Sequence, residues 1–195
     1  MTGIPVAQPG HRIVLTGSES TGKTILTERL AAYYRVPWIP EYAREYALRK
    51  GAPLDVVDVE PIARGQLALE AQGLRQAGPL VIYDTDLLST AVYAKHYYDW
   101  CPPWVEAAAR GRSGRYLLLD IDAPWFPDRT RGPGSRRREL HQRFLRELES
   151  AGVAWSLIGG DYEERFLKAI AEIDALLPYS PAIPQPESQE SRHVR

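Results

Sequence analysis

A glycine-rich segment near the N-terminus carries the clearest chemical signal in the chain. Residues 17–24 read GSESTGKT, which matches G-x-x-x-x-G-K-[ST] between an apolar run and a helical pattern, the context that this motif requires. Backbone N–H groups and the dipole of the following helix favour phosphate oxygens there, and we expect Lys23 to neutralise the β and γ phosphates and Thr24 to hold magnesium. The segment therefore predicts a site for ATP and Mg²⁺. The residues expected to contact the nucleotide are Gly17, Ser18, Glu19, Ser20, Thr21, Gly22, Lys23, Thr24 and Ile25.

Carboxylates that follow two apolar runs are the next candidates. Asp84 has the placement of a carboxylate that holds magnesium directly or through water, and its alternative role, a cap for the next helix, suits Thr85 or Asp86 equally well. Glu41 lies where P-loop kinases of small molecules keep the carboxylate that accepts a proton from the substrate hydroxyl. The alternative for Glu41 is that it is an ordinary glutamate in the first turn of a helix, where the helix dipole favours a negative charge. Asp86 is a competing base, or a group that binds the hydroxyls of the substrate.

An arginine-rich segment at residues 123–138 also contains several prolines and glycines, so it is predicted to be a loop. We expect a lid that closes over ATP, excludes water and directs guanidinium groups at the transferred phosphoryl group. Arg129 and Arg131 are the candidates for this role, whereas the arginines at 136–138 can simply face solvent. The alternative for the whole segment is a solvated basic loop.

Aromatic residues near predicted strand ends and the lid offer flat rings that can stack on a cationic ring. Core packing is the simpler explanation for Trp38, Tyr42, Tyr93 and Phe126. Trp125 lies inside a polar loop, where core packing is the weaker explanation, and we expect it to bind substrate.

The framework that positions these residues follows from the alternation of apolar β-rich runs with helical patterns. The predicted strands are 12–16, 36–40, 79–83, 115–120 and 153–159. The predicted helices are 23–34, 41–50 ended by Gly51, 56–77, one after Asp86, a short one ended by Gly111, 136–149, and one from Asp161. Alternation of this kind predicts a five-stranded parallel sheet covered on both faces, with ligands at the carboxyl ends of the strands. The residues expected at that edge are Gly17, Glu41, Asp84, Asp120 and Gly160.

Length and composition indicate one domain, because 195 residues with 44% hydrophobic residues suffice for a single α/β core. We expect a flexible lead-in at 1–10, the domain at 11–177, and a disordered proline-rich tail at 178–195. The net charge is −1 with both signs interleaved, which gives no indication of a nucleic-acid or membrane partner. The single cysteine, Cys101, excludes an intramolecular disulfide and fits a reducing compartment. We therefore expect a cytoplasmic protein with a small-molecule partner, and the oligomeric state stays open.

Further motifs resemble the ribosylnicotinamide kinase domain of the bacterial NadR family, over about residues 12–171. They are PEYAREY at 40–46, YDTDLLSTAVY at 83–93, DAPWFPDRTR at 122–131, RRRELHQRF at 136–144 and GGDYEERF at 159–166. The resemblance implies a P-loop kinase-like fold and ATP-dependent phosphorylation of the 5′-hydroxyl of nicotinamide riboside, which gives nicotinamide mononucleotide. The family's nucleotidyltransferase and DNA-binding domains have no counterpart in this length, so we expect a kinase that stands alone. The lid also departs from the family's D-G-x-R pattern, because Arg129 follows Asp128 directly.

Matching positions in that family imply that Lys23 and Thr24 bind ATP and magnesium, that Asp84 lies in the metal region, and that Glu41 and Arg44 line the riboside pocket. They also imply that Trp125 lies near the nicotinamide and that the adenine border is formed by Gly160, Asp161, Tyr162 and Glu163. Combined with the patterns above, the expected catalytic residues are Lys23, Glu41, Asp84, Arg129 and Arg131, the substrate-binding residues are Glu41, Tyr42, Arg44, Asp86 and Trp125, and the magnesium ligands are Thr24 and Asp84. Two alternatives stay open: a kinase of another nucleoside or small metabolite, and a regulatory module in which ATP only orders the arginine loop.

Overall fold

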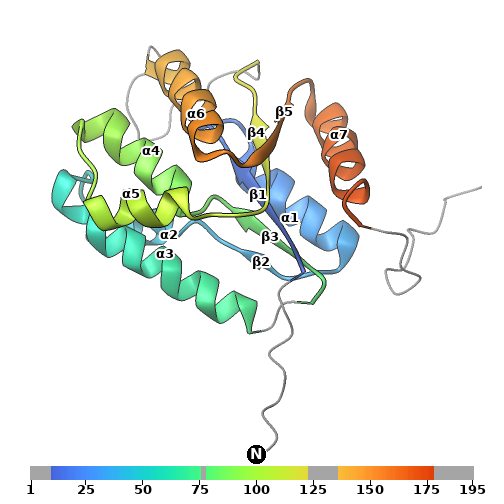
Figure 1. Cartoon of the computed structure of the whole chain (residues 1–195), viewed down its shortest axis with the longest axis horizontal. Helices are drawn as coiled ribbons and strands as arrows, with labels where there is room; N and C mark the ends of the chain where they lie inside the picture. The colour runs from blue at the N-terminus through green and yellow to red at the C-terminus, as the bar shows by residue number, and fades with distance from the viewer. Residues whose placement is uncertain (1–9, 76–77, 123–135, 178–195) are drawn as a thin grey trace, which may run out of the picture.

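A computed structural model describes residues 10–75, 78–122 and 136–177 of the chain (Figure 1). Its centre is a five-stranded, entirely parallel sheet with the strand order β2-β3-β1-β4-β5. The strands are β1 (His11–Thr16), β2 (Trp38–Ile39), β3 (Leu80–Asp84), β4 (Arg115–Leu119) and β5 (Ala154–Ile158). The predicted five-stranded parallel sheet is confirmed.

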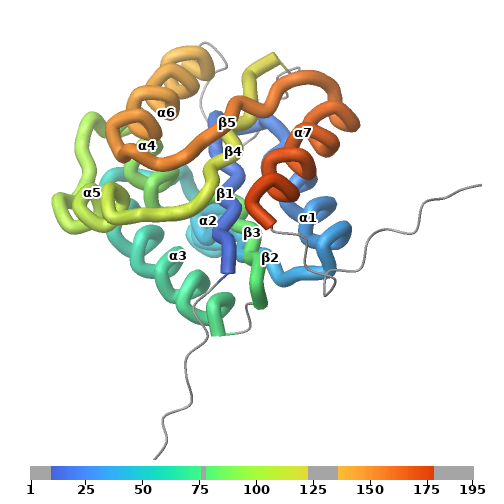
Figure 2. The backbone as a smooth tube through the Cα atoms, turned by 45° about the vertical axis from the view of Figure 1, so that its right-hand side comes forward, coloured from blue at the N-terminus to red at the C-terminus, as the bar shows by residue number. Residues whose placement is uncertain are grey.

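Helices cover both faces of this sheet (Figure 1 and Figure 2). Helices α1 (Lys23–Tyr34) and α7 (Tyr162–Asp174) lie on one face. The opposite face carries α3 (Val59–Leu74), α4 (Leu87–Tyr98), α5 (Pro103–Arg110) and α6 (Arg137–Ala151). Helix α2 (Tyr42–Lys50) packs against α3. None of the helices in the described part of the chain has the length and apolar content needed to cross a membrane.

The core has two halves because side chains alternate between the faces of a strand. In β3, Leu80 and Ile82 join the half under α1 and α7, whereas Val81 and Tyr83 join the half under α3 to α6. All four side chains are fully buried. A strand that is buried on both faces reads as a continuous apolar run, which is why this strand is recognisable from the sequence alone.

The helix predicted over 56–77 is wrong at both ends. A 3₁₀ turn, η1 (Val56–Asp58), precedes α3, which ends at Leu74. Asp55 accepts a hydrogen bond from the N–H of Val56, while the Asp58 carboxylate accepts one from the N–H of Asp55 at 2.7 Å. This reciprocal cap fixes the turn before α3 begins. The pair of aspartates three residues apart is the sequence signal that could have revealed it.

Asp86, which the sequence suggested as a substrate ligand or competing base, is buried at the start of α4, where it has a structural role. Its Oδ1 accepts a hydrogen bond from the N–H of Leu88 at 3.0 Å and thereby caps the helix. Its Oδ2 accepts one from the Tyr116 hydroxyl at 2.7 Å and lies 3.5 Å from the Arg12 guanidinium. The residue is 0% exposed, and each of these partners belongs to the framework of the fold.

Replacing Asp86 with alanine should lower the free energy of unfolding by about 3–5 kcal/mol, because the change removes a cap, the acceptor of the buried Tyr116 hydroxyl, and a carboxylate beside the partly buried Arg12 guanidinium. Urea denaturation followed by circular dichroism would measure it. Asp161→Ala is the matched control, since Asp161 caps α7 on the surface and its loss should cost only about 1 kcal/mol. Equal losses in the two variants would show that the buried contacts of Asp86 contribute nothing.

Candidate active site

The phosphate-binding segment connects β1 to α1 at the carboxyl edge of the sheet. Gly17 and Gly22 have φ angles of +129° and +86°, a region that favours glycine. At Gly17 a Cβ atom would also lie only 2.9 Å from the carbonyl oxygen of Leu119 in β4. Both glycines are therefore required by the backbone path, and the neighbouring strand contributes to that requirement.

Lys23 lies inside the loop, with its side chain directed back along it. The residue is 5% exposed, and its ammonium donates hydrogen bonds to the carbonyl oxygens of Gly17 at 2.9 Å and Ser18 at 2.7 Å. The Thr21 hydroxyl donates to the same Ser18 oxygen at 2.9 Å. These bonds close the loop around a positive charge, the arrangement that a bound polyphosphate needs.

Thr24 and Asp84 form a pair beside the loop. The Thr24 hydroxyl donates to Asp84 Oδ2 at 2.6 Å, and Asp84 is 1% exposed. Burial raises the pKa of the Asp84 carboxyl, repulsion from Glu41 adds to the rise, and attraction to Lys23 opposes it. Asp84 Oδ1 is buried and has no hydrogen-bond partner among the described residues, which is unusual for a carboxylate oxygen. A hydroxyl beside a carboxylate oxygen with an unused lone pair suits Mg²⁺, which prefers oxygen ligands.

Asp84→Asn should raise by about tenfold the Mg²⁺ concentration needed for tight binding of a non-hydrolysable ATP analogue, because the amide keeps the shape and removes the charge. Calorimetric titration of the analogue at a series of Mg²⁺ concentrations would measure this. Asp120→Asn is the control, since Asp120 follows β4 at the same edge and accepts a hydrogen bond from the N–H of Ile121. Similar shifts in both variants would contradict a specific role for Asp84.

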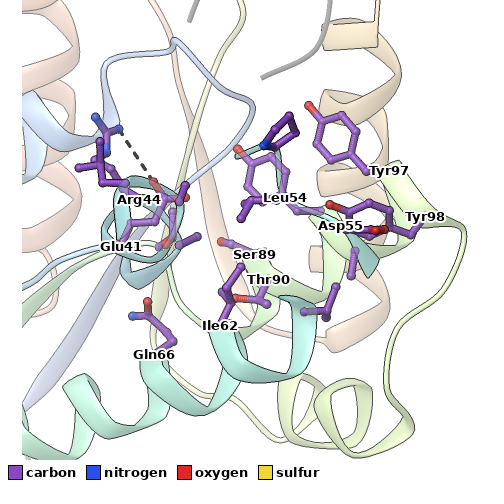
Figure 3. A pocket seen from close by; sticks show the side chains of 18 of the residues that line it. Glu41, Arg44, Leu54, Asp55, Ile62, Gln66, Ser89, Thr90, Tyr97 and Tyr98 are labelled. Carbon is purple, nitrogen blue, oxygen red and sulfur yellow. Dashed lines mark ion pairs between the residues drawn. The ribbon is translucent and has the colours of Figure 1, made fainter. Parts of the chain in front are cut away.

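A cavity of about 500 Å³ opens next to this pair, between α2, α3 and α4 (Figure 3). Its volume is within the range typical of small-molecule sites. The polar and aromatic residues that line it are Glu41, Arg44, Asp55, Gln66, Thr85, Ser89, Thr90, Tyr93, Tyr97, Tyr98 and Arg136. Leu54 and Ile62 are among its apolar walls. The sequence indicated Glu41 and Arg44 for substrate binding and favoured core packing for Tyr93, and it did not indicate Asp55, Ser89, Tyr97 or Tyr98.

Glu41 and Arg44 lie where the cavity meets the Thr24 and Asp84 pair. Glu41 occupies the cap position of α2 and is 8% exposed, yet its side chain does not cap that helix. Arg44 is half exposed, and its guanidinium is 3.9 Å from Glu41 Oε2 and 3.4 Å from the Thr24 hydroxyl. A carboxylate at this junction can reach both a substrate in the cavity and the phosphate end of the site.

Tyr42, for which the sequence suggested substrate binding, is not among the residues that line the cavity. Its ring lies against Gly65 of α3, where a Cβ atom would be 2.0 Å from the ring. Its hydroxyl accepts a hydrogen bond from Arg49 at 2.5 Å, and its N–H donates to the Gln66 side chain at 2.9 Å. Tyr42 therefore packs α2 against α3.

Trp38 packs against the half of the core under α1 and α7, in agreement with the core packing that was the simpler explanation for this residue.

Two buried arginines near the phosphate-binding loop were not predicted. Arg137 is 6% exposed and donates to the Ser20 carbonyl at 3.4 Å, so the expectation that it faces solvent is wrong. Arg165 donates to the carbonyl oxygens of Thr21 at 2.7 Å and Gly160 at 2.8 Å. The spacing of Arg137 from the buried residues of its own helix, Leu140, Phe144 and Leu148, is the signal that could have revealed it.

The Arg165 contacts place the loop after β5 beside the phosphate-binding loop. Asp161 caps α7 by accepting hydrogen bonds from the N–H groups of Glu163 and Glu164, both at 2.9 Å. Tyr162 is 43% exposed, with the Arg29 guanidinium 5.3 Å from its ring centre. The guanidinium of Arg165 thus connects residues 160–163, the proposed adenine border, to the phosphate-binding loop.

Trp125, Arg129 and Arg131 lie outside the described residues, as does the predicted lid up to residue 135.

Residues 12–165 match the sequence model of a family described as AAA domain. The chain belongs to this AAA domain family. Among its relatives is the trifunctional NAD biosynthesis/regulator protein NadR of Escherichia coli (strain K12), 27% identical over 166 residues, which are 81% of this chain and 40% of that protein. NadR of Salmonella typhimurium is 25% identical over 173 residues, 85% of this chain and 42% of its own length. This AAA domain chain thus spans about two fifths of these curated relatives.

Solved structures give the same relationship. A NadR protein in complex with NR superposes with a TM-score of 0.76 at 25% identity, covering 86% of this chain and 51% of that one. A NadR protein in complex with NAD and AMP-PNP gives 0.74 at 26% identity, covering 86% and 49%. A thymidylate kinase from Candida albicans shares the fold, with a TM-score of 0.64 at 15% identity over 86% and 92%. The expected P-loop kinase-like fold of this AAA domain protein is confirmed.

Proposed function

We propose that this protein is an ATP- and Mg²⁺-dependent kinase that phosphorylates the 5′-hydroxyl of nicotinamide riboside to give nicotinamide mononucleotide. The observation that carries the proposal is the junction at Glu41, where the phosphate-binding loop and the Thr24 and Asp84 pair meet the cavity of about 500 Å³. The similar NadR structures, one with NR and one with AMP-PNP, support both the acceptor and the phosphoryl donor.

Phosphoryl transfer depends on positioning and charge compensation more than on covalent chemistry by the protein. Lys23 holds a positive charge where the β and γ phosphates bind, and Thr24 with Asp84 supplies oxygen ligands for magnesium. Magnesium, when bound, offsets the charge of the phosphate oxygens. Glu41 orients the acceptor hydroxyl and takes its proton as the bond to the γ-phosphorus forms and the bond to the ADP oxygen breaks.

The cavity chemistry favours a cationic aromatic acceptor. Tyr93 and Tyr97 contribute aromatic rings, while the carboxylates of Glu41 and Asp55 are equalled in number by the guanidinium groups of Arg44 and Arg136. The pyridinium ring of nicotinamide riboside is flat and positively charged, so it gains from aromatic faces both by stacking and by cation–π attraction. Its ribose offers the hydroxyl that Glu41 needs. A neutral nucleoside gains the stacking but not the cation–π attraction.

Single-turnover transfer from γ-labelled ATP with Mg²⁺ tests this function. Nicotinamide riboside, adenosine, uridine, thymidine and a sample without acceptor are compared, and labelled nicotinamide mononucleotide should dominate. Preferential labelling of another nucleoside would keep the kinase chemistry and reject the acceptor. Slow hydrolysis without labelling of any acceptor would reject the kinase and favour a regulatory module whose conformation responds to ATP.

A further inference from the structure

One face of α4 is hydrogen-bonded, turn by turn, to the end of β1 and the phosphate-binding loop. The hydroxyls of Ser89 and Thr16 are 2.8 Å apart. One turn later the Tyr93 hydroxyl donates to the Gly17 carbonyl oxygen at 3.0 Å. These contacts continue one turn further at Tyr97, and we call the three side chains Ser89, Tyr93 and Tyr97 the hydroxyl ladder. Their spacing of four residues puts them on the same helix face.

The third side chain of the hydroxyl ladder, Tyr97, contacts a carboxylate within the phosphate-binding loop itself. The Tyr97 hydroxyl donates to Glu19 Oε1 at 3.1 Å, and Glu19 is 1% exposed. Glu19 Oε2 is buried and has no hydrogen-bond partner among the described residues. Glu19 is attracted to the guanidinium of Arg137, and a buried carboxylate also depends strongly on the few donors that hold its oxygens in place. The conformation of the loop at Glu19 therefore depends on where Tyr97 lies.

The same three side chains line the acceptor cavity. The rings of Tyr93 and Tyr97 are stacked, with centroids 6.2 Å apart and planes 1° apart, so the movement of one ring constrains the other. Each tyrosine thus lines the cavity and donates its hydroxyl to the loop. An occupant of the cavity that contacts these side chains would restrict the positions that their hydroxyls can take.

We infer that the hydroxyl ladder couples the two substrates: Tyr93 and Tyr97 are positioning residues that hold the phosphate-binding loop ready for ATP, and an acceptor in the cavity strengthens this hold. Coupling of this kind is reciprocal, so ATP must tighten acceptor binding by the same factor. The hydroxyl ladder should affect nucleotide binding even when no acceptor is present. The coupling to the acceptor rests on the proposed kinase function.

The first test measures Mg²⁺·AMP-PNP binding without acceptor by calorimetry. Tyr97→Phe keeps the ring and removes the donor to Glu19, and we expect binding about five- to tenfold weaker. Tyr34→Phe is the matched control, because the Tyr34 hydroxyl donates to the Asp174 carboxylate at 2.8 Å on the other face of the sheet. It removes an equivalent bond and should change nucleotide affinity less than twofold. Equal affinities for Tyr97→Phe and the wild type would overturn the inference.

A double-mutant cycle localises the effect to the contact. Glu19→Ala and Tyr97→Phe should each weaken AMP-PNP binding, and the double variant should be little worse than either, because both remove the same bond. Glu19→Gln retains an oxygen acceptor for Tyr97 and should recover affinity relative to Glu19→Ala. Fully additive losses would show that Tyr97 acts on the nucleotide by another route and would reject the ladder.

The second test measures the coupling itself. In the wild type, saturating nicotinamide riboside should tighten AMP-PNP binding by at least about fivefold, and the factor should fall toward one in Tyr93→Phe and Tyr97→Phe. A factor unchanged in both variants would reject the coupling. A wild-type protein that does not bind nicotinamide riboside would instead reject the proposed acceptor, and the result without acceptor would then decide whether the ladder positions the loop.

Discussion

Lys23→Ala should lower the rate of phosphoryl transfer by about 1,000-fold or more, whichever acceptor is used. The charge of Lys23 is held inside the loop by the carbonyl oxygens of Gly17 and Ser18, so it is already in place when the phosphates bind. A preorganised charge in a water-poor site stabilises the transition state more than a mobile surface charge does. Single-turnover kinetics at saturating ATP would measure the loss, and thermal unfolding would confirm that the variant is folded.

Lys95→Ala provides the control for this variant. Lys95 is also partly buried and is paired with two carboxylates, Glu147 at 3.3 Å and Glu106 at 3.6 Å, in the half of the core under α3 to α6. Its loss therefore reproduces the removal of a partnered lysine without touching the phosphate site. Transfer by Lys95→Ala should stay within about threefold of the wild type. A Lys23→Ala enzyme that keeps a tenth of the wild-type rate would contradict the proposed phosphate site.

Glu41→Gln should reduce transfer by about 100- to 10,000-fold while binding of AMP-PNP changes only severalfold. The amide keeps the size of the side chain at the junction of cavity and phosphate site but does not accept the hydroxyl proton. Separate measurements of single-turnover rate and analogue affinity would show this division. Because a regulatory module has no acceptor to deprotonate, its response to ATP would survive the change, which makes Glu41 the residue that separates the two functions.

Glu45→Gln is the matched control for Glu41→Gln. Glu45 lies one turn further along α2, is exposed, and pairs with Arg49 at 3.6 Å on the surface. A neutral amide there alters the same helix without entering the cavity, so the transfer rate should stay close to that of the wild type. Comparable losses in the two variants would indicate a general effect on α2 and would remove Glu41 from the role of base.

The framework was predictable from the sequence because its signals are local. The apolar run before Asp84 and the glycine and lysine pattern at 17–24 each specify an element through residues that are neighbours in the chain. Parallel alternation of strand and helix then brings the ends of β1 and β3 together, where Leu15 pairs with Asp84. The Thr24 and Asp84 contact, 60 residues apart in the chain, follows from these local rules.

The choice between neighbouring residues was less predictable. Asp84 and Asp86 are two positions apart in the sequence and have the same chemistry. In the structure Asp84 faces the phosphate site, whereas Asp86 is buried between Tyr116 and Arg12. Arg137 is buried against Ser20 although both of its neighbours in the chain are exposed arginines. No local pattern distinguishes Asp84 from Asp86, because their partners come from other strands and loops, whereas the burial of Arg137 is indicated by its spacing from the buried residues of α6.

The sequence by itself determined the phosphate-binding loop, the parallel sheet and the edge at which the site forms, since motif and periodicity act through residues close together in the chain. The tertiary structure alone decided which carboxylate lies beside Thr24, where the cavity opens, and that Tyr93 and Tyr97 reach from that cavity to the loop. The physical reason is that burial and hydrogen bonding of a side chain depend on groups brought near it by the packing of distant segments, and this packing is fixed only when the whole sheet and its helices assemble.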